Sequence, residues 1–150
     1  MKRRPLFSTD LSVSSRGLGT VKFGRNQQVK YPSGFELPTN KEILALLDLA
    51  QEMGINFLDT APAYGLSEER LGKLLGSRRE EWVIMSKAGE DFVEGQSRFD
   101  FSSCAIIDSV ERTLLRLRTD RVECLLLHSD GNDLEILNHS GAVEALFQLK

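Results

Sequence analysis

The sequence predicts an α/β fold in which helices cover a parallel sheet. Short, almost continuous apolar runs indicate strands that are buried on both faces, and these runs lie at 18–23, 55–58, 82–85 and 122–127. Amphipathic segments separate the runs, so strand and helix alternate along the chain. Two architectures agree with this alternation, namely an open doubly wound sheet and a (β/α) barrel.

The helix after the first strand has the clearest signals. Thr39 and Glu42 form a capping box, because a threonine N-cap is followed three residues later by a glutamate. Apolar residues then recur at helical spacing, at Ile43, Leu46, Leu47 and Ala50. Gly54 marks the end of this helix. The polar segment 25–38 before it is predicted to be a loop.

Three further helices are predicted. One begins at Ser67, with Glu68 and Glu69 in a first turn where the helix dipole favours negative charge. Another is capped by Ser102 or Ser103, and its apolar face is Ile107, Val110, Leu114 and Leu117. The last is capped by Ser140 and carries Val143, Leu146 and Phe147. The segment 88–101 between the third strand and the third helix is predicted to be a long loop.

Composition and charge exclude several classes of function. The chain has 150 residues, enough for one domain, and a net charge of −3, so a nucleic-acid partner is not expected. Its apolar runs fall short of the roughly 18 residues of a membrane span, so no membrane partner is expected. Cys104 and Cys124 match no metal or redox spacing and are interpreted as core residues. We therefore expect no metal and a reducing, cytoplasmic location.

Polar, ionisable residues stand where three predicted strands end. These residues are Asp59, Lys87 and His128, and Tyr64 follows in the loop that leaves the first of the three strand ends. Each alone has an ordinary structural explanation, such as a turn cap or a solvated lysine. In a parallel sheet all these ends lie at one edge, which in barrels is where catalysis occurs. Together they predict a candidate active site.

Several motifs resemble the aldo-keto reductase superfamily. They are Gly17-Leu18-Gly19-Thr20, the segment Asn56 to Gly65 with its Asp-Thr-Ala-Pro-Ala-Tyr-Gly, Ser67-Glu68-Glu69-Arg70-Leu71-Gly72, Ser86-Lys87 and Leu126-Leu127-His128. The resemblance covers residues 17–150 and implies a (β/α)8 TIM barrel. It implies the catalytic tetrad Asp59, Tyr64, Lys87 and His128 and the cofactor NADPH. Gly19, Thr20 and Val21, with Asp59, would then lie near the nicotinamide.

The resemblance also implies a reaction. A hydride passes from the nicotinamide to a carbonyl carbon of an aldehyde, ketone or sugar, and Tyr64 acts as the general acid. Lys87 would favour the phenolate form of Tyr64, and Asp59 would hold Lys87 in place. His128 would hydrogen-bond the substrate carbonyl and orient it. The cofactor supplies the hydride and the protein supplies position and electrostatics.

The chain departs from the family in length, because it carries about four of the eight βα units. Residues 1–150 are therefore expected to form a single incomplete domain, inactive alone and able to self-associate through open sheet edges. The alternative is a non-catalytic half barrel or interaction module derived from such an enzyme. A doubly wound nucleotide-binding domain is disfavoured, since Lys22 occupies the third glycine position of the expected fingerprint.

Overall fold

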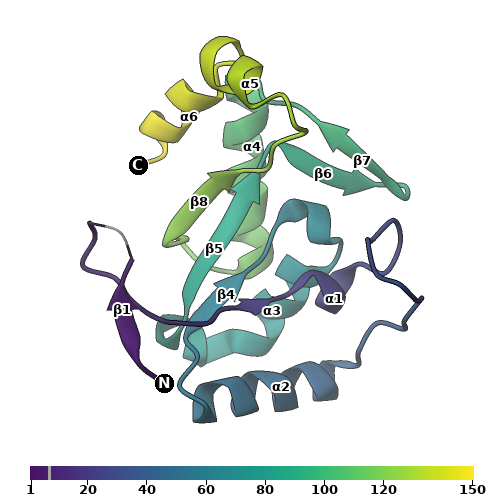
Figure 1. Cartoon of the computed structure of the whole chain (residues 1–150), viewed down its shortest axis with the longest axis vertical. Helices are drawn as coiled ribbons and strands as arrows, with labels where there is room; N and C mark the ends of the chain where they lie inside the picture. The colour runs from purple at the N-terminus through teal and green to yellow at the C-terminus, as the bar shows by residue number, and fades with distance from the viewer. Residues whose placement is uncertain (7) are drawn as a thin grey trace.

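The computed structural model describes residues 1–6 and 8–150, and its centre is a four-stranded parallel sheet (Figure 1). The strands are β3 (Leu18–Gly19), β4 (Phe57–Asp59), β5 (Val83–Ala88) and β8 (Cys124–Leu127), and they pair in that order. In chain order, each strand of this sheet lies on the same side of the strand before it. A doubly wound sheet reverses direction at a switch point, whereas a barrel grows in one direction. The strand order therefore favours the barrel.

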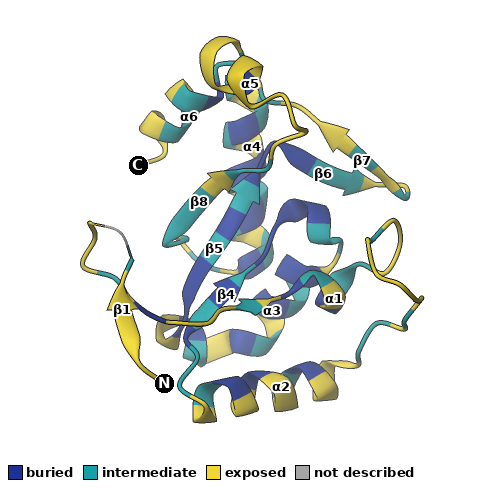
Figure 2. Cartoon of the chain, in the orientation of Figure 1, coloured by how far each residue is buried: buried dark blue, intermediate teal, exposed yellow. Residues whose placement is uncertain are grey.

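Helices α2 (Asn40–Glu52), α3 (Ser67–Leu75) and α4 (Ser103–Leu117) pack on the outer face of this sheet. The larger core cluster joins Ile43 and Leu47 of α2, Leu71 of α3 and Leu117 of α4 to Leu58 and Ile84 of the sheet. Figure 2 colours the ribbon dark blue where residues are buried, and this colour lies on the sheet and on the sides of the helices that face it. The predicted capping box of α2 is confirmed, with the Thr39 hydroxyl accepting from the Glu42 backbone amide.

Helices α3 and α4 approach each other closely at Gly72. A Cβ atom at this position would lie 2.1 Å from the carbonyl oxygen of Arg116, so only glycine fits the crossing. This contact fixes α3 against α4 behind the sheet. It also explains the glycine that follows Leu71 in the predicted helix.

The inner face of the sheet carries Phe57, Met85, Cys124 and Leu126 beside the polar residues of the candidate site. Their shared face follows from the register, because Met85 pairs with Cys124 and Lys87 pairs with Leu126. Leu126 is 39% exposed and the other three are half-buried. The sheet is therefore well covered on its outer face and accessible on its inner face.

The amino-terminal segment forms an antiparallel hairpin of β1 (Arg3–Pro5) and β2 (Ser12–Ser14) that the sequence analysis missed. The backbone amide of Ser14 donates to the side chain of Asn56 at 2.8 Å, so the hairpin is tied to the start of β4. The first predicted strand is shorter than expected. It ends at Gly19, and Val21 already begins the short helix α1 (Val21–Gly24).

The predicted loop 88–101 is wrong, because most of it forms a second antiparallel hairpin of β6 (Glu90–Val93) and β7 (Gln96–Phe99). After β8 the chain forms α5 (Asp133–His139), which was not predicted, and α6 (Ala142–Gln148). Gly141, rather than Ser140, is the N-cap of α6. Two short 3₁₀ helices, η1 (Pro62–Tyr64) and η2 (Gly76–Glu81), complete the elements.

The expectation that both cysteines lie in the core is corrected. Cys104 is exposed on α4, and Cys124 is half-buried. Glu68 and Glu69 do lie in the first turn of α3, as predicted, and Glu68 is fully buried there. In residues 1–6 and 8–150, no helix combines the length and apolar character needed to cross a membrane.

Candidate active site

The four predicted tetrad residues come together at the carboxyl edge of the parallel sheet. Asp59 ends β4, Lys87 lies near the end of β5, His128 directly follows β8, and Tyr64 ends η1. The ammonium of Lys87 forms an ion pair with the carboxylate of Asp59 and donates to the carbonyl oxygen of Thr60 at 3.0 Å. It lies 3.1 Å from the phenol oxygen of Tyr64. Lys87 therefore links the acid and the tyrosine directly.

Tyr64 is positioned by a turn that only glycine permits. Gly65 has φ +60°, and a Cβ atom there would lie 2.4 Å from the carbonyl oxygen of Gly24. Pro62 starts η1, and the Tyr64 amide closes the turn on the Ala61 carbonyl at 3.0 Å. The phenol ring thus leaves the turn toward Lys87.

His128 is the fourth member and contacts the others less directly. Its ring stands edge-on to the ring of Tyr64, with centroids 6.1 Å apart. Its backbone amide donates to Ala88 at 2.8 Å, which continues the pairing of β8 with β5. Burial lowers the pKa of the His128 imidazole, although the neighbouring carboxylates of Glu90 and Asp59 act in the opposite direction. The ring is therefore disposed toward its neutral form.

Glu90 is a residue of this site that the sequence analysis did not single out. Its Oε2 lies 3.0 Å from Nδ1 of His128, within ion-pair distance. This contact does not have the geometry of a hydrogen bond. Within the described residues, the buried Nδ1 of His128 therefore has no hydrogen-bond partner. The only sequence signal for Glu90 was the concentration of acids and aromatics in 88–101.

Arg25 connects Glu90 to the backbone of the tyrosine turn. Its guanidinium donates to the carbonyl oxygen of Ala63 at 2.9 Å and lies 3.6 Å from the Glu90 carboxylate. The guanidinium also stacks on the ring of Phe92, with a distance of 3.7 Å to the centroid. The Ser97 hydroxyl donates to Glu90 at 2.6 Å. The hairpin β6–β7 is thereby fixed beside His128 and Tyr64.

The three residues expected beside the nicotinamide differ in accessibility. Gly19 is exposed, and a Cβ atom added there would meet nothing within 4 Å, so open space lies next to it. Val21 is half-buried. Thr20 is fully buried, and its hydroxyl donates to the Asp59 carbonyl at 2.9 Å and accepts from Ser67 at 2.8 Å. A contact between the Thr20 side chain and a ligand would require rearrangement.

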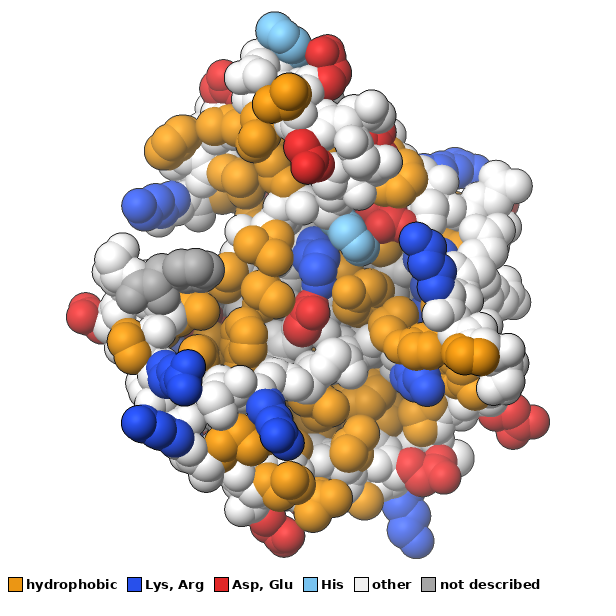
Figure 3. Space-filling view, in the orientation of Figure 1, with side chains coloured by type: hydrophobic (Ala, Val, Ile, Leu, Met, Phe, Trp, Pro, Cys, Tyr) orange, Lys and Arg blue, Asp and Glu red, His pale blue; other side chains and the backbone are white. Residues whose placement is uncertain are grey.

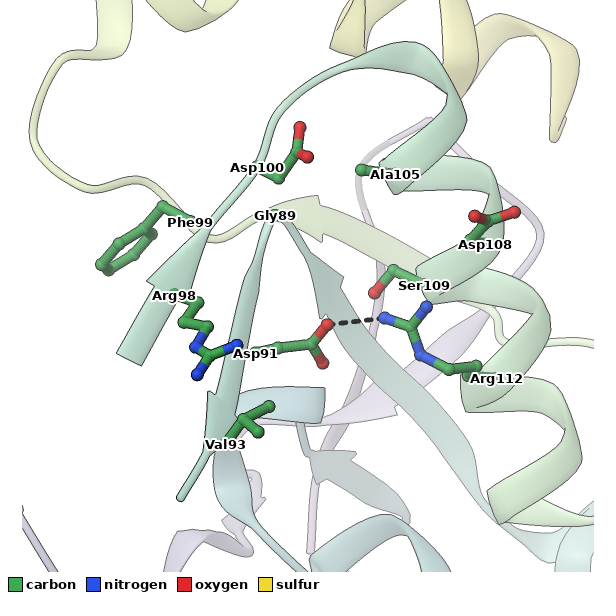
Figure 4. Close-up of a pocket in the computed structure, with 10 residues that line it drawn as sticks. All are labelled: Gly89, Asp91, Val93, Arg98, Phe99, Asp100, Ala105, Asp108, Ser109 and Arg112. Carbon is green, nitrogen blue, oxygen red and sulfur yellow. Dashed lines mark hydrogen bonds and ion pairs between the residues drawn. The ribbon is translucent and has the colours of Figure 1, made fainter. Parts of the chain in front are cut away.

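The tetrad opens on the inner face of the sheet rather than into an enclosed cavity. Figure 3 shows a group of basic, acidic and histidine side chains at the centre of this view, between hydrophobic side chains. A separate cavity of about 450 Å³ lies between the hairpin and α4 (Figure 4). Asp91 and Arg112 form an ion pair of 2.6 Å inside it. Because no tetrad residue lines this cavity, it is distinct from the candidate active site.

Comparisons with known proteins point to one family. The model of the Aldo/keto reductase family matches residues 17–149. The chain is 33% identical, over its whole length, to the uncharacterized oxidoreductase YqkF of Bacillus subtilis, and 35% identical, over 83% of its length, to L-galactose dehydrogenase of Arabidopsis thaliana.

Solved structures give the same result. A crystal structure from Pseudomonas aeruginosa, assigned to the aldo-keto reductases, superposes with a TM-score of 0.90 at 56% identity over 99% of this chain and 55% of that one. The holo form of aldo-keto reductase AKR11C1 from Bacillus halodurans gives 0.80 at 32% identity, over 100% and 46% of the two chains.

The chain spans about half the length of the relatives it matches, including 45% of YqkF. Its parallel sheet and covering helices accordingly form part of a (β/α)8 TIM barrel. The match of the family model over nearly the whole chain, together with the relatives above, shows that the chain belongs to the aldo/keto reductase family.

Proposed function

We propose that this chain carries the catalytic tetrad of a cytoplasmic, NADPH-dependent reductase of aldehyde, ketone or sugar carbonyls. The observation that supports the proposal best is the contact of Lys87 with both Asp59 and Tyr64. A tyrosine beside a lysine ammonium at the carboxyl edge of a barrel sheet is suited to proton transfer. The thiols of Cys104 and Cys124 are both free, which agrees with a reducing compartment.

The proposed chemistry assigns one task to each residue. Tyr64 donates its phenolic proton to the carbonyl oxygen as that oxygen gains negative charge, and it regains a proton from solvent afterwards. Lys87 stabilises the phenolate that remains, and Asp59 holds the ammonium in place. His128, whose ring stands edge-on to the ring of Tyr64, orients the substrate oxygen. A nicotinamide cofactor, when bound, supplies the hydride.

The residues near β3 fit a planar group lying against the sheet edge. Gly19 offers open space beside Asp59, with which it pairs in the sheet. Val21 would add a half-buried apolar surface at the same edge. The buried Thr20 would support this edge from below through its bonds to Asp59 and Ser67. NADPH is preferred here on the family resemblance alone, and the choice between NADPH and NADH belongs to the test.

The test compares two proteins. One is the 150-residue chain. The other is expressed from the same gene together with any coding sequence that follows the codon for Lys150. NADPH and NADH binding are followed by cofactor fluorescence, and reduction of a generic aldehyde is followed by loss of cofactor absorbance. We expect weak cofactor binding and no turnover from the chain alone, with clear turnover from a longer product. Turnover with NADH only would overturn the cofactor assignment.

A non-catalytic half barrel or interaction module is the competing proposal. It is favoured by one observation, namely that the chain spans only 37% to 55% of the relatives cited above. If the gene encodes nothing beyond Lys150 and the chain neither binds cofactor nor reduces carbonyls, this alternative replaces the reductase. The intact contacts among Asp59, Lys87 and Tyr64 support descent from an enzyme in either case.

A further inference from the structure

The least satisfied polar atom near the tetrad is Nδ1 of His128. It is buried, it has no hydrogen-bond partner among the described residues, and the carboxylate of Glu90 lies 3.0 Å away. We propose that Glu90 is a positioning residue that holds a proton on Nδ1 of His128, so that the neutral ring presents the lone pair of Nε2 to the substrate. The consequence for catalysis rests on the proposed function, whereas the protonation state itself does not.

Glu90 is firmly held in this position. It is 9% exposed, and its Oε1 accepts from the Ser97 hydroxyl at 2.6 Å and faces the Arg25 guanidinium at 3.6 Å. Arg25 is in turn held by the carbonyl oxygens of Ala63, Gln27 and Gln28. With Oε1 engaged on that side, Oε2 is the oxygen left for His128.

The chemistry of the pair decides which nitrogen carries the proton. An ionised carboxylate only accepts hydrogen bonds, so the imidazole nitrogen beside it must be the donor. Two carboxylates and two cations face the ring. Glu90 from β6 and Asp59 from β4 favour a proton on the imidazole, while Lys87 from β5 and Arg25 from the loop after α1 oppose it. Tyr64 adds the edge of its ring.

This assignment changes what His128 can do in the reaction. With the proton on Nδ1, the neutral ring accepts a hydrogen bond at Nε2 but cannot donate one to a carbonyl oxygen. Donation from Nε2 then requires the doubly protonated ring. Carbonyl reduction should therefore fall as the pH rises through the pKa of His128. Alcohol oxidation should instead rise with pH, because Nε2 of the neutral ring can accept a hydrogen bond from the hydroxyl group of the alcohol.

The test reads the tautomer directly. The chain contains two histidines, and His139 is exposed on α5, so it serves as an internal reference. Imidazole nitrogen chemical shifts of the ¹⁵N-histidine-labelled protein are recorded as a function of pH. The variants are Glu90→Gln and, as a matched control on the same hairpin, the exposed Glu94→Gln. In Glu90→Gln the introduced side-chain amide can donate to Nδ1, so it no longer restricts the proton to that atom.

We expect neutral His128 to carry its proton on Nδ1 in the parent and in the Glu94→Gln protein. In Glu90→Gln the Nε2–H tautomer should become populated and the pKa of His128 should fall, because the nearby negative charge is gone. His139 should be unaffected in all three. A parent His128 with its proton on Nε2 overturns the proposal, and that result needs no variant to fold.

Activity separates this inference from the proposed function. If the tautomer shifts as described but no carbonyl is reduced, Glu90 positions His128 and the reductase assignment is wrong. If the longer gene product is active, Glu90→Gln should lose the fall of reduction at high pH, since its neutral ring can donate from Nε2. A high-pH limb unchanged in Glu90→Gln would contradict the positioning role even where the tautomer shifts.

Discussion

The hydroxyl of Ser86 donates a 2.8 Å hydrogen bond to the carboxylate of Glu68, which is fully buried between the sheet and its helices. Glu68 also accepts from the Thr113 hydroxyl at 3.0 Å and from the Arg116 guanidinium at 3.4 Å. Burial raises the pKa of the Glu68 carboxyl, and these three donors act against that effect. Because Ser86 immediately precedes Lys87, the buried acid fixes β5 at the position where the Lys87 side chain leaves it.

Replacing Glu68 with alanine should destabilise the chain strongly. The substitution leaves the Ser86 and Thr113 hydroxyls without their buried acceptor and removes the partner of Arg116. Leaving buried hydroxyl groups without an acceptor in this way costs about 3 kcal/mol of unfolding free energy. Urea unfolding of Glu68→Ala measures the loss, and Glu69→Ala on the same helix turn is the control. Equal unfolding midpoints for the two variants would show that the buried network contributes little.

Replacing Tyr64 with phenylalanine should abolish carbonyl reduction in any product of the gene that reduces carbonyls. The ring and its packing remain, but the proton donor facing Lys87 is lost. A general acid contributes about 10²–10⁴ in rate. Steady-state kinetics with an aldehyde should show this loss in turnover while cofactor fluorescence reports unchanged binding. Near-normal turnover of Tyr64→Phe would show that another group donates the proton.

Replacing Lys87 with methionine should reduce activity and, to a smaller degree, stability. The substitution leaves the Asp59 carboxylate without its cation and Tyr64 without the ammonium. The Asp59 side chain is 34% exposed, so water can partly replace the lysine and the stability cost should be only about 1 kcal/mol. Denaturant unfolding gives this cost, and the pH profile of reduction gives the electrostatic effect. A variant with the parent's pH profile would argue against any influence of Lys87 on Tyr64.

The grouping of Asp59, Tyr64, Lys87 and His128 could be predicted from the sequence because each residue stands at a recognisable place. Asp59, Lys87 and His128 lie where apolar runs end, and parallel strands end at one edge whatever the details of packing. Glu90 could not be found in this way. It begins a hairpin strand in a segment with weak alternation, and its role depends on Arg25 and Ser97, which lie far from it in sequence or on the opposite strand.

The burial of some polar residues could not be predicted from the sequence either. Glu68 has the pattern of a surface acid in a first helical turn, yet the crossing of α3 and α4 at Gly72 encloses it. The short β1–β2 hairpin was missed for a related reason. It is held by the reciprocal bonds of Ser14 and Asn56 and not by an apolar run. Such tertiary bonds leave no periodic signal.

The stability of the chain should depend on the protonation of His128. Burial lowers the folded-state pKa of His128 below its ordinary value near 6.5, so the unfolded chain binds the proton more readily. The stabilisation is therefore complete above pH 6.5 and is lost as the pH falls through the folded-state pKa. The difference in unfolding free energy between the parent and His128→Asn, measured across this range, should show the trend. His139→Asn, an exposed control, should stay parallel to the parent.

The 150-residue chain expressed alone should self-associate through the edge and inner face of its sheet. Among the described residues, β8 pairs only with β5 in this sheet, so its other edge is unpaired, and Leu126 on that strand is 39% exposed. Unpaired edges next to apolar surface favour pairing with a second copy. Light scattering should therefore report a species larger than the monomer.

Leu126→Lys places a charge on this edge strand and should shift the population toward monomer, whereas Leu115→Lys, on the exposed side of α4, should not. A parent chain that is monomeric at all concentrations tested would contradict this prediction, and equal effects of the two lysines would show that association uses another surface.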